Sequence, residues 1–488
     1  MKFSGHGRNE GEHMSSFYSR ATIALLLASM ASTAGAQISV KQGAFNLSGM
    51  VEIETAEMMK VRTAIFMQNR TLDHNWYNHI TGTLNFIGQP NYRLTLKGSF
   101  EFKQYMNMSA WWATQMNRGA YNLGDFLYHD FFIREAQGVF SVMESKAFSL
   151  DVSLGLQPYK YTAESREFGE YLFRSGTYPF LLTGEFDRPF SRLTGLRAAI
   201  VSNFDFINLK ADAFVLTERE LRPYWDISLA GVGAVNLFKI LEIGGGINLA
   251  HCIPTNEKYV TPDSSINTYI KDSSLVWDEA VQADVMTYDT GYYTFKGTKV
   301  MARGSIDLFG IFGLMGISRG DGSFWSDFFG PTGGKVFGEI AIIGLNSYPK
   351  SIQPDANPLG YDTLAQRMPW VAGFHLPMWK LLDECELEFE WYPNPYPNNT
   401  AMVHWVGLPL PYPKNISEDY PLGRGARWYW SLYLKKQVLK NFTIVSQIGR
   451  DHLRWEMPMP YYNSNYDFEE AMCKPDQWGW HVKTIFSF

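Results

Sequence analysis

The sequence ends with WGWHVKTIFSF, residues 478–488, and this stretch decides the fold. Apolar and polar side chains alternate along it, and one face carries the bulky or β-branched residues Trp478, Trp480, Val482, Thr484, Phe486 and Phe488. A period of two predicts a β-strand with one apolar and one polar face. Such a strand at a free sheet edge promotes aggregation, whereas in a closed barrel its apolar face can meet lipid.

Four residues of this stretch, Trp480, Val482, Phe486 and the terminal Phe488, carry a resemblance to a known family. The stretch resembles the last strand of Gram-negative outer-membrane β-barrel proteins, including porins. In that family, the barrel-assembly machinery reads an aromatic-terminated strand. The resemblance implies an outer-membrane location, lipid as the surroundings of the chain, and a C-terminal assembly signal at these four residues.

The same alternation recurs along the chain. It is clear in residues 92–104, 148–157, 207–215, 241–249, 299–308, 384–391 and 427–435. Each run is about nine to eleven residues long, which is the length that a tilted strand needs to cross the hydrocarbon layer. We therefore predict an all-β fold, a transmembrane antiparallel up-and-down barrel.

The connections between the runs alternate between short and long, as periplasmic turns and extracellular loops do. Short turns are expected near residues 89, 144–146, 204–206, 238, 310, 379–383 and 436–440. Residues 44–54 and 60–67 are two weak strand candidates that can also form one long strand. Tracing the strands from both ends gives conflicting directions around residues 345–368, so we predict about 16–18 strands, with 18 slightly preferred.

The N-terminus has the pattern of a secretory signal. Arg20 precedes an apolar run at 21–30, and small residues follow at 31–36. Cleavage after Ala36 would leave residues 37–488 as a single barrel domain with long extracellular loops, and translation can also begin at Met14. Beyond residues 21–30 we find no run of about 18 apolar residues, so ordinary membrane-spanning helices are excluded.

Composition excludes several other classes of protein. The 488 residues have a formal net charge of -6, which does not suggest a nucleic-acid partner. The 15 Trp, 27 Tyr and 34 Phe fit aromatic girdles at the membrane interfaces, or loops rich in aromatic residues. Three cysteines do not form a disulfide framework, although Cys252 and Cys473 both fall in expected outer loops and could pair. We find no hydrolase motif and no clustered His or Cys ligands, so we predict no enzyme, no cofactor and no metal.

The sharpest functional pattern is a row of four glutamates, Glu384, Glu386, Glu388 and Glu390, at a spacing of two. They alternate with apolar residues, so in a barrel all four point into the lumen. They could make the wall negative and favour cations, or pair across strands with Arg427, Lys435, Lys299 and Arg303. The residues predicted to line the pore are Arg93, Lys97, Glu101, Asp151, Lys210, Asp212, Glu242, Lys299, Arg303, Asp307, Glu384, Glu386, Glu388, Glu390, Arg427 and Lys435.

Residues 161–190 form a long charged connection in which glutamates and arginines mix with aromatic residues. In general porins, a long loop folds inward and narrows the pore. Residues 161–190 could do the same, but we favour an outward surface loop.

These patterns together predict a porin-like channel for passive diffusion of small hydrophilic solutes. A wide barrel leaves an aqueous lumen, and charged wall residues filter the solutes that enter. The alternative is a non-conducting barrel that serves as a surface scaffold or adhesin through its long aromatic-rich loops. The solute and the oligomeric state do not follow from the sequence, which allows a homo-oligomer.

Overall fold

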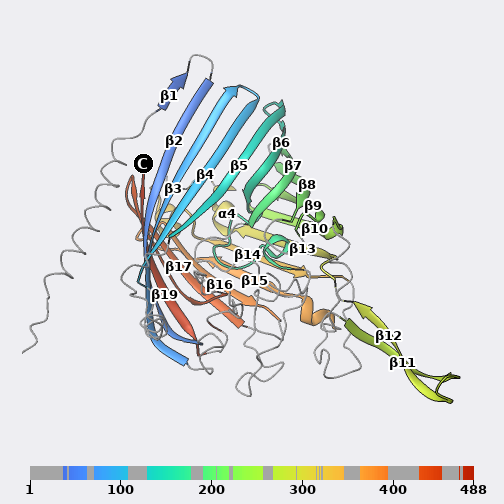
Figure 1. Ribbon diagram of the computed structural model, residues 1–488. Coiled ribbons are helices and arrows are strands. Elements are labelled where there is room, and N and C mark those ends of the chain that lie inside the picture. The colour runs from blue at the N-terminus through green and yellow to red at the C-terminus, as the bar shows by residue number, and fades with distance from the viewer. Residues whose placement is uncertain are drawn as a thin grey trace, which may run out of the picture.

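The structure is a computed structural model. It describes residues 37–40, 43–62, 71–107, 129–176, 191–204, 206–218, 224–255, 268–292, 294–314, 316–317, 319, 322–345, 363–393, 428–452, 472 and 476–488. Sixteen strands, β2 to β10 and β13 to β19, form one antiparallel ring, because β9 pairs with β10 and β19 pairs with β2. The predicted all-β antiparallel barrel of about 16–18 strands is thus confirmed (Figure 1), at the lower end of that range rather than at the slightly preferred 18.

The first half of the ring is made of strands joined alternately by longer connections and by short turns. They are β2 (Gly43–Arg62), β3 (Thr71–Asn91), β4 (Leu94–Asn107), β5 (His129–Glu144), β6 (Phe148–Tyr159), β7 (Ser191–Asn203), β8 (Ile207–Thr217), β9 (Ile227–Leu237) and β10 (Leu241–Ile253). The two weak candidates near the start, residues 44–54 and 60–67, are therefore one long strand, β2, as far as Arg62, and residues 63–67 lie outside the described residues. A short strand, β1 (Gln37–Val40), pairs with β2 at residues 43–46.

The second half closes the ring. It consists of β13 (Gly297–Asp307), β14 (Lys335–Ile342), β15 (Trp370–His375), β16 (Glu384–Trp391), β17 (Trp428–Leu439), β18 (Phe442–Arg450) and β19 (Trp478–Ser487). The backbone N–H groups and carbonyls of Gly49 and Phe488 bond to each other at 3.0 and 2.9 Å, so the ladder between β19 and β2 continues to the last residue. No backbone edge is left where the chain ends, which removes the aggregation problem of a terminal strand.

Side chains on the outside of the ring are apolar and exposed. Large apolar residues at least a third exposed occur on β4, β6, β10, β13 and β16, for example Phe102, Leu154, Ile243, Ile306 and Phe389. An apolar surface of this extent is far larger than a water-soluble monomer normally exposes. It is the surface that a lipid bilayer would cover. Within the described residues, no helix has the length and apolarity needed to cross a membrane.

Two connections differ from the prediction. The connection expected near residue 310 is not a short turn: it holds α4 (Leu308–Leu314) and α5 (Phe324–Phe329). The rings of Phe312 and Trp325 stack on each other, and Phe328 contacts Trp379 edge-on. The segment expected as a long loop after β10 contains a separate hairpin, β11 (Thr268–Asp278) and β12 (Ala283–Tyr292). This hairpin lies at the end of the barrel opposite the short turns and the C-terminus (Figure 1).

Candidate functional site

Register places most of the predicted pore-lining residues on one face of the ring. Starting from Glu386, which lies opposite His375 and Tyr433, the pairing can be followed from strand to strand around the barrel. The inward face found in this way carries Lys97, Glu101, Asp151, Lys210, Asp212, Glu242, Lys299, Arg303, Asp307, Glu384, Glu386, Glu388, Glu390 and Lys435. Arg93 instead lies in the exposed turn between β3 and β4, and Arg427 lies outside the described residues.

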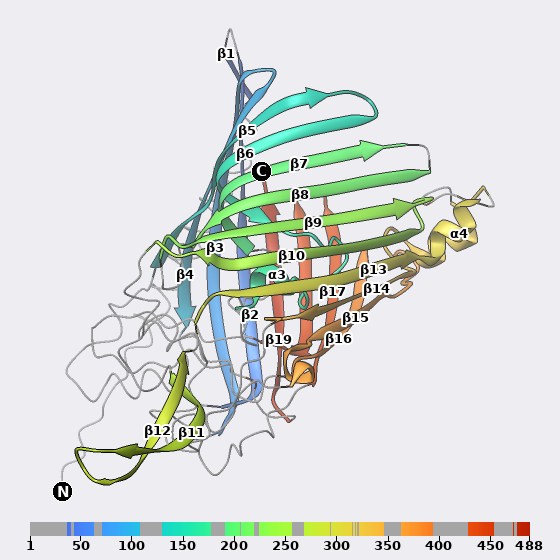
Figure 2. The ribbon, with the colours of Figure 1, turned by 90° about the vertical axis from the view of Figure 1, so that its right-hand side faces the viewer.

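The connection after β6 folds into the barrel. Residues 160–175, called the inward loop below, follow β6 and end with the single helical turn α3 (Tyr171–Arg174), which lies within the ring of strands (Figure 2). Phe168, Glu170, Tyr171 and Leu172 are at most 1% exposed. The favoured interpretation of this segment as an outward surface loop is therefore wrong for residues 160–175.

The carboxylate of Glu388 on β16 holds the middle of the inward loop, residues 166–168. It accepts the backbone N–H groups of three consecutive residues: Arg166, Glu167 at 3.1 Å and Phe168 at 2.8 Å. Bonds to an ionised acceptor are stronger than neutral ones. They also satisfy backbone donors that would otherwise be buried without partners. Glu388 thus acts as an anchor for the chain inside the barrel.

A second anchor, Glu339 on β14, holds the part of the loop that follows. Its carboxylate accepts the backbone N–H of Glu170 at 2.9 Å, the N–H of Tyr171 at 3.0 Å and the hydroxyl of Tyr161 at 2.6 Å. Gly169 has φ +83, and a Cβ at this position would lie 3.0 Å from the Glu339 Oε2 atom. A glycine is needed here both for the backbone conformation and for the close approach to the anchor.

The remaining glutamates of β16 also face the loop. Glu384 accepts the Arg166 Nε at 2.6 Å, and Glu390 accepts the Tyr171 hydroxyl at 2.7 Å. Lys435 lies opposite Glu384 in the ladder, but this carboxylate pairs with Arg166, whose Nη2 atom is 2.6 Å from its Oε1 atom. The four carboxylates are buried beneath the loop, with exposures between 0% and 4%, and so do not form an open negative wall.

Apolar contacts complete the docking of the loop. Leu172 packs over Gly246 of β10, where a Cβ would lie 2.6 Å from the Leu172 Cδ1 atom. Phe173 contacts Phe214 of β8 edge-on at 5.6 Å between ring centroids, and Phe168 lies 6.5 Å from the Tyr429 ring of β17. The loop is therefore held across a wide arc of the wall, from β8 to β17.

Burial changes the protonation of charged groups on the loop. Burial, together with the charge of the nearby Glu339 carboxylate, raises the pKa of the Glu170 carboxyl to about 8. The Glu170 carboxyl accepts the backbone N–H of Tyr161 at 3.0 Å, which opposes the shift. Burial, followed by the charge of Arg166, lowers the pKa of Lys160.

A separate charged network lies on the wall formed by β19, β2, β3 and β4. Glu54 lies between the His79 Nε2 atom at 3.2 Å and the His481 Nδ1 atom at 3.1 Å. Lys483 is 3.6 Å from Glu52 on the same wall. The inward face here consists of paired charges, whereas the face under the loop consists of carboxylates bound to backbone.

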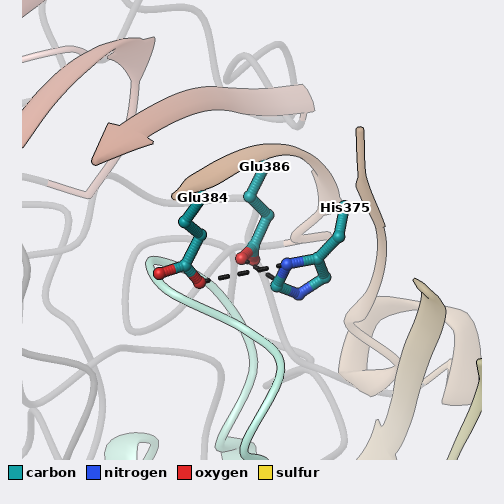
Figure 3. A group of neighbouring side chains, drawn as sticks. All are labelled: His375, Glu384 and Glu386. Carbon is teal, nitrogen blue, oxygen red and sulfur yellow. Dashed lines mark ion pairs between the residues drawn. The ribbon is translucent and has the colours of Figure 1, made fainter. Parts of the chain in front are cut away.

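Three side chains are grouped closely enough to hold a metal ion. They are His375, Glu384 and Glu386, whose ligand atoms lie within 4.8 Å of one another (Figure 3). The sequence predicted no metal, because His375 stands nine residues before Glu384 and only the hairpin of β15 and β16 brings them together. Glu339, the second anchor, was also missed, since it is a single glutamate in a short apolar strand.

Comparisons with known proteins give structural likeness alone. No known family profile matches the sequence, and no curated protein matches it. A triple mutant of the Rhodopseudomonas blastica porin aligns with a TM-score of 0.39 and 6% identity, over 91% of this chain and 100% of that chain. Another mutant of that porin aligns with a TM-score of 0.40 and 6% identity, over the same shares of the two chains. A chain described as "Asymmetric conductivity of engineered proteins" aligns with a TM-score of 0.39 and 7% identity, again over 91% of this chain and 100% of that chain.

Proposed function

We propose that this chain is an outer-membrane, porin-like channel through which small hydrophilic solutes diffuse passively. The observation that carries the proposal is the inward loop, which is anchored by Glu388 and Glu339 inside a closed ring of strands. A loop held in this way narrows a lumen and fixes its cross-section. The inward-facing charged residues would then filter the solutes that reach the constriction.

Several parts of the proposal concern the surroundings of the barrel. The exposed apolar outer face would contact lipid, and residues 1–36 would be the cleaved signal that directs export. The strand that ends at Phe488 would be recognised by the barrel-assembly machinery. Membrane fractionation, with N-terminal sequencing of the mature chain, tests location and processing together: an outer-membrane protein that begins at Gln37 is expected.

Single-channel recording tests the channel itself. We expect the mature chain, refolded and inserted into a planar bilayer, to give stable current steps that rise linearly with voltage. In liposome swelling, small neutral sugars should enter quickly and larger ones progressively more slowly. A folded barrel that never conducts and never passes sugars would contradict the proposal.

A second candidate function is supported by the hairpin of β11 and β12. At the end of the barrel opposite the C-terminus, it exposes Leu275, Trp277, Val281 and Tyr288, with exposures between 48% and 65%. Exposed apolar side chains on a projecting element favour a binding role, so the barrel could be a surface scaffold or adhesin. Deletion of residues 268–292 tests this role. Loss of cell-surface binding with unchanged conductance would assign the binding to the hairpin. Absence of conductance in the intact chain would instead make the barrel a scaffold.

A further inference from the structure

A group of three side chains lies inside the barrel near its short-turn end. His375 is the last residue of β15, and Glu384 and Glu386 lie at the start of β16. The His375 Nδ1 atom is 3.9 Å from the Glu384 Oε1 atom, and its Nε2 atom is 3.2 Å from the Glu386 Oε2 atom. Figure 3 shows the two carboxylates and the imidazole turned toward one another.

The hydrogen bonding of His375 leaves a lone pair facing this group. Its Nε2 atom is 3.2 Å from the backbone oxygen of Glu164 in the inward loop. A carbonyl oxygen can only accept, so Nε2 carries the proton and Nδ1 is unprotonated. Nδ1 is buried and has no hydrogen-bond partner. Metal-binding histidines usually have this arrangement, in which the other ring N–H donates to a backbone carbonyl or a carboxylate.

The burial of Glu386 is a second, independent observation that favours cation binding at this group. Its side chain is 0% exposed, and its Oε2 atom lies 3.2 Å from the His375 Nε2 atom, but neither carboxylate oxygen has a partner in hydrogen-bonding geometry. The nearest positive charge is Arg166, whose Nε atom is 3.9 Å from Glu386 but 2.6 Å from Glu384. One guanidinium therefore faces two carboxylates and bonds only one of them. An unpaired buried carboxylate is strongly unfavourable, so either a proton or a further cation must neutralise Glu386.

We propose that His375, Glu384 and Glu386 bind one divalent transition-metal ion, with Zn²⁺ as the best fit. One imidazole nitrogen and two carboxylate oxygens match a three-ligand zinc site with a water in the fourth position. The imidazole disfavours Ca²⁺ and Mg²⁺, which take oxygen ligands. Tetrahedral ligands about 2.0–2.2 Å from the ion lie about 3.4 Å apart. The 3.9 Å between the His375 Nδ1 atom and Glu384 is close to this value, and Glu386, which lies 3.2 Å from the Nε2 atom, would turn toward the Nδ1 side to complete the site.

The ion would also strengthen the docking of the inward loop. His375 contacts the loop through Glu164, and Glu384 contacts it through Arg166. A cation on these ligands fixes the imidazole orientation that the Glu164 carbonyl requires. The site does not depend on conduction, since a plugged barrel would present the same ligands.

Zinc binding to the refolded mature barrel tests the proposal. After removal of metals with EDTA, the wild type should bind one Zn²⁺ per chain in isothermal titration and elemental analysis. His375→Gln and Glu386→Gln should each weaken binding more than about 100-fold, beyond the 10–100-fold that loss of an outer-shell partner costs. Asp151→Asn is the matched control, because this carboxylate faces the lumen on β6 and pairs with Ser141. It should bind zinc as the wild type does.

Two further measurements keep the test decisive. Circular dichroism checks that each variant has folded, and Glu386→Asp, which keeps the charge and withdraws the ligand, replaces any variant that has not. Co²⁺ added to the wild type should give the visible absorption of a four-coordinate site and should be displaced by Zn²⁺. The absence of stoichiometric zinc, or zinc retained in the folded variants, would overturn the proposal and assign the charge compensation of Glu386 to Arg166 or a proton.

Discussion

The carboxylate of Glu388 holds the backbone amide of Phe168 at 2.8 Å, although 220 residues separate the two in the sequence. The same carboxylate binds the amides of the two residues before Phe168, so one side chain fixes a complete turn of the inward loop. Its ionic charge is important for this, because neutral acceptors make weaker bonds. Removal of the charge should release this part of the loop.

We therefore expect Glu388→Gln to loosen the inward loop while the barrel stays folded. The loss should be about 2 kcal/mol of docking free energy, the usual value for a hydrogen bond to a charged group. Trypsin cleavage after Arg166 should become faster, and the single-channel conductance should become larger and noisier. Asp151→Asn, at a carboxylate on the same face that bonds the Ser141 hydroxyl rather than the loop backbone, should leave the cleavage rate unchanged. Equal cleavage rates for wild type and Glu388→Gln would remove Glu388 from its role as an anchor.

Gly246 on β10 gives a steric test of the same docking. A Cβ at this position would lie 2.6 Å from the Leu172 Cδ1 atom, so Gly246→Val should push Leu172 away from the wall. Overpacking of this kind typically costs about 1–3 kcal/mol. The expected result is faster proteolysis of the loop with an unchanged strand content in circular dichroism. Gly82→Ala is the control, since nothing lies within 4 Å of its added Cβ. An identical effect of both substitutions would point to general weakening of the sheet.

The sequence was sufficient to predict the barrel because strand alternation is local. Each β-strand shows its two faces within about ten residues, so the inward position of Glu384 to Glu390 could be read directly. The closure of the ring followed from the aromatic last strand. Lys97, Glu101 and Asp151 were assigned to the correct face in the same way.

The inward loop could not be predicted, because its anchors are contacts between carboxylates and backbone amides far along the chain. Backbone amides are the same in every residue, so they leave no sequence pattern, and Glu339 stands alone in an apolar strand. One signal was available in the sequence. Three consecutive residues of β10, Gly244, Gly245 and Gly246, have no side chain, which indicates close approach of another segment. Arg93 was misplaced because the turn after β3 lies at Tyr92 and Arg93, about three residues beyond the turn expected near residue 89, so the strand expected from residue 92 begins at Leu94.

Docking of the loop should weaken as the pH rises. The pKa of Glu170 is raised to about 8 in the docked loop from an ordinary value of 4.5, so the docked form holds the proton more tightly than a released loop would. Docking is therefore strongest below pH 4.5, weakens by up to about tenfold per pH unit as the pH rises, and is constant above about 8. The ratio of conductance at pH 9 to that at pH 6 should exceed one.

Glu170→Gln removes the titrating group and should bring this conductance ratio close to one. The amide keeps an acceptor for the N–H of Tyr161, so the loop can still dock. A ratio that stays the same in this variant would assign the pH dependence to another group, such as Lys160, whose pKa is lowered by burial.

The last residue joins the final strand to β2, and its ring packs on Gly49. A Cβ on Gly49 would lie 2.4 Å from the Phe488 Cζ atom, so the glycine makes room for the ring. Phe488→Ala keeps the backbone bonds to Gly49 but removes this contact and the terminal aromatic group. We expect a several-fold lower yield of folded barrel in the outer membrane, measured by heat-dependent mobility on a gel. Refolding of the same variant in detergent separates the two causes: normal refolding would assign the loss to recognition during assembly, whereas poor refolding would assign it to packing against β2.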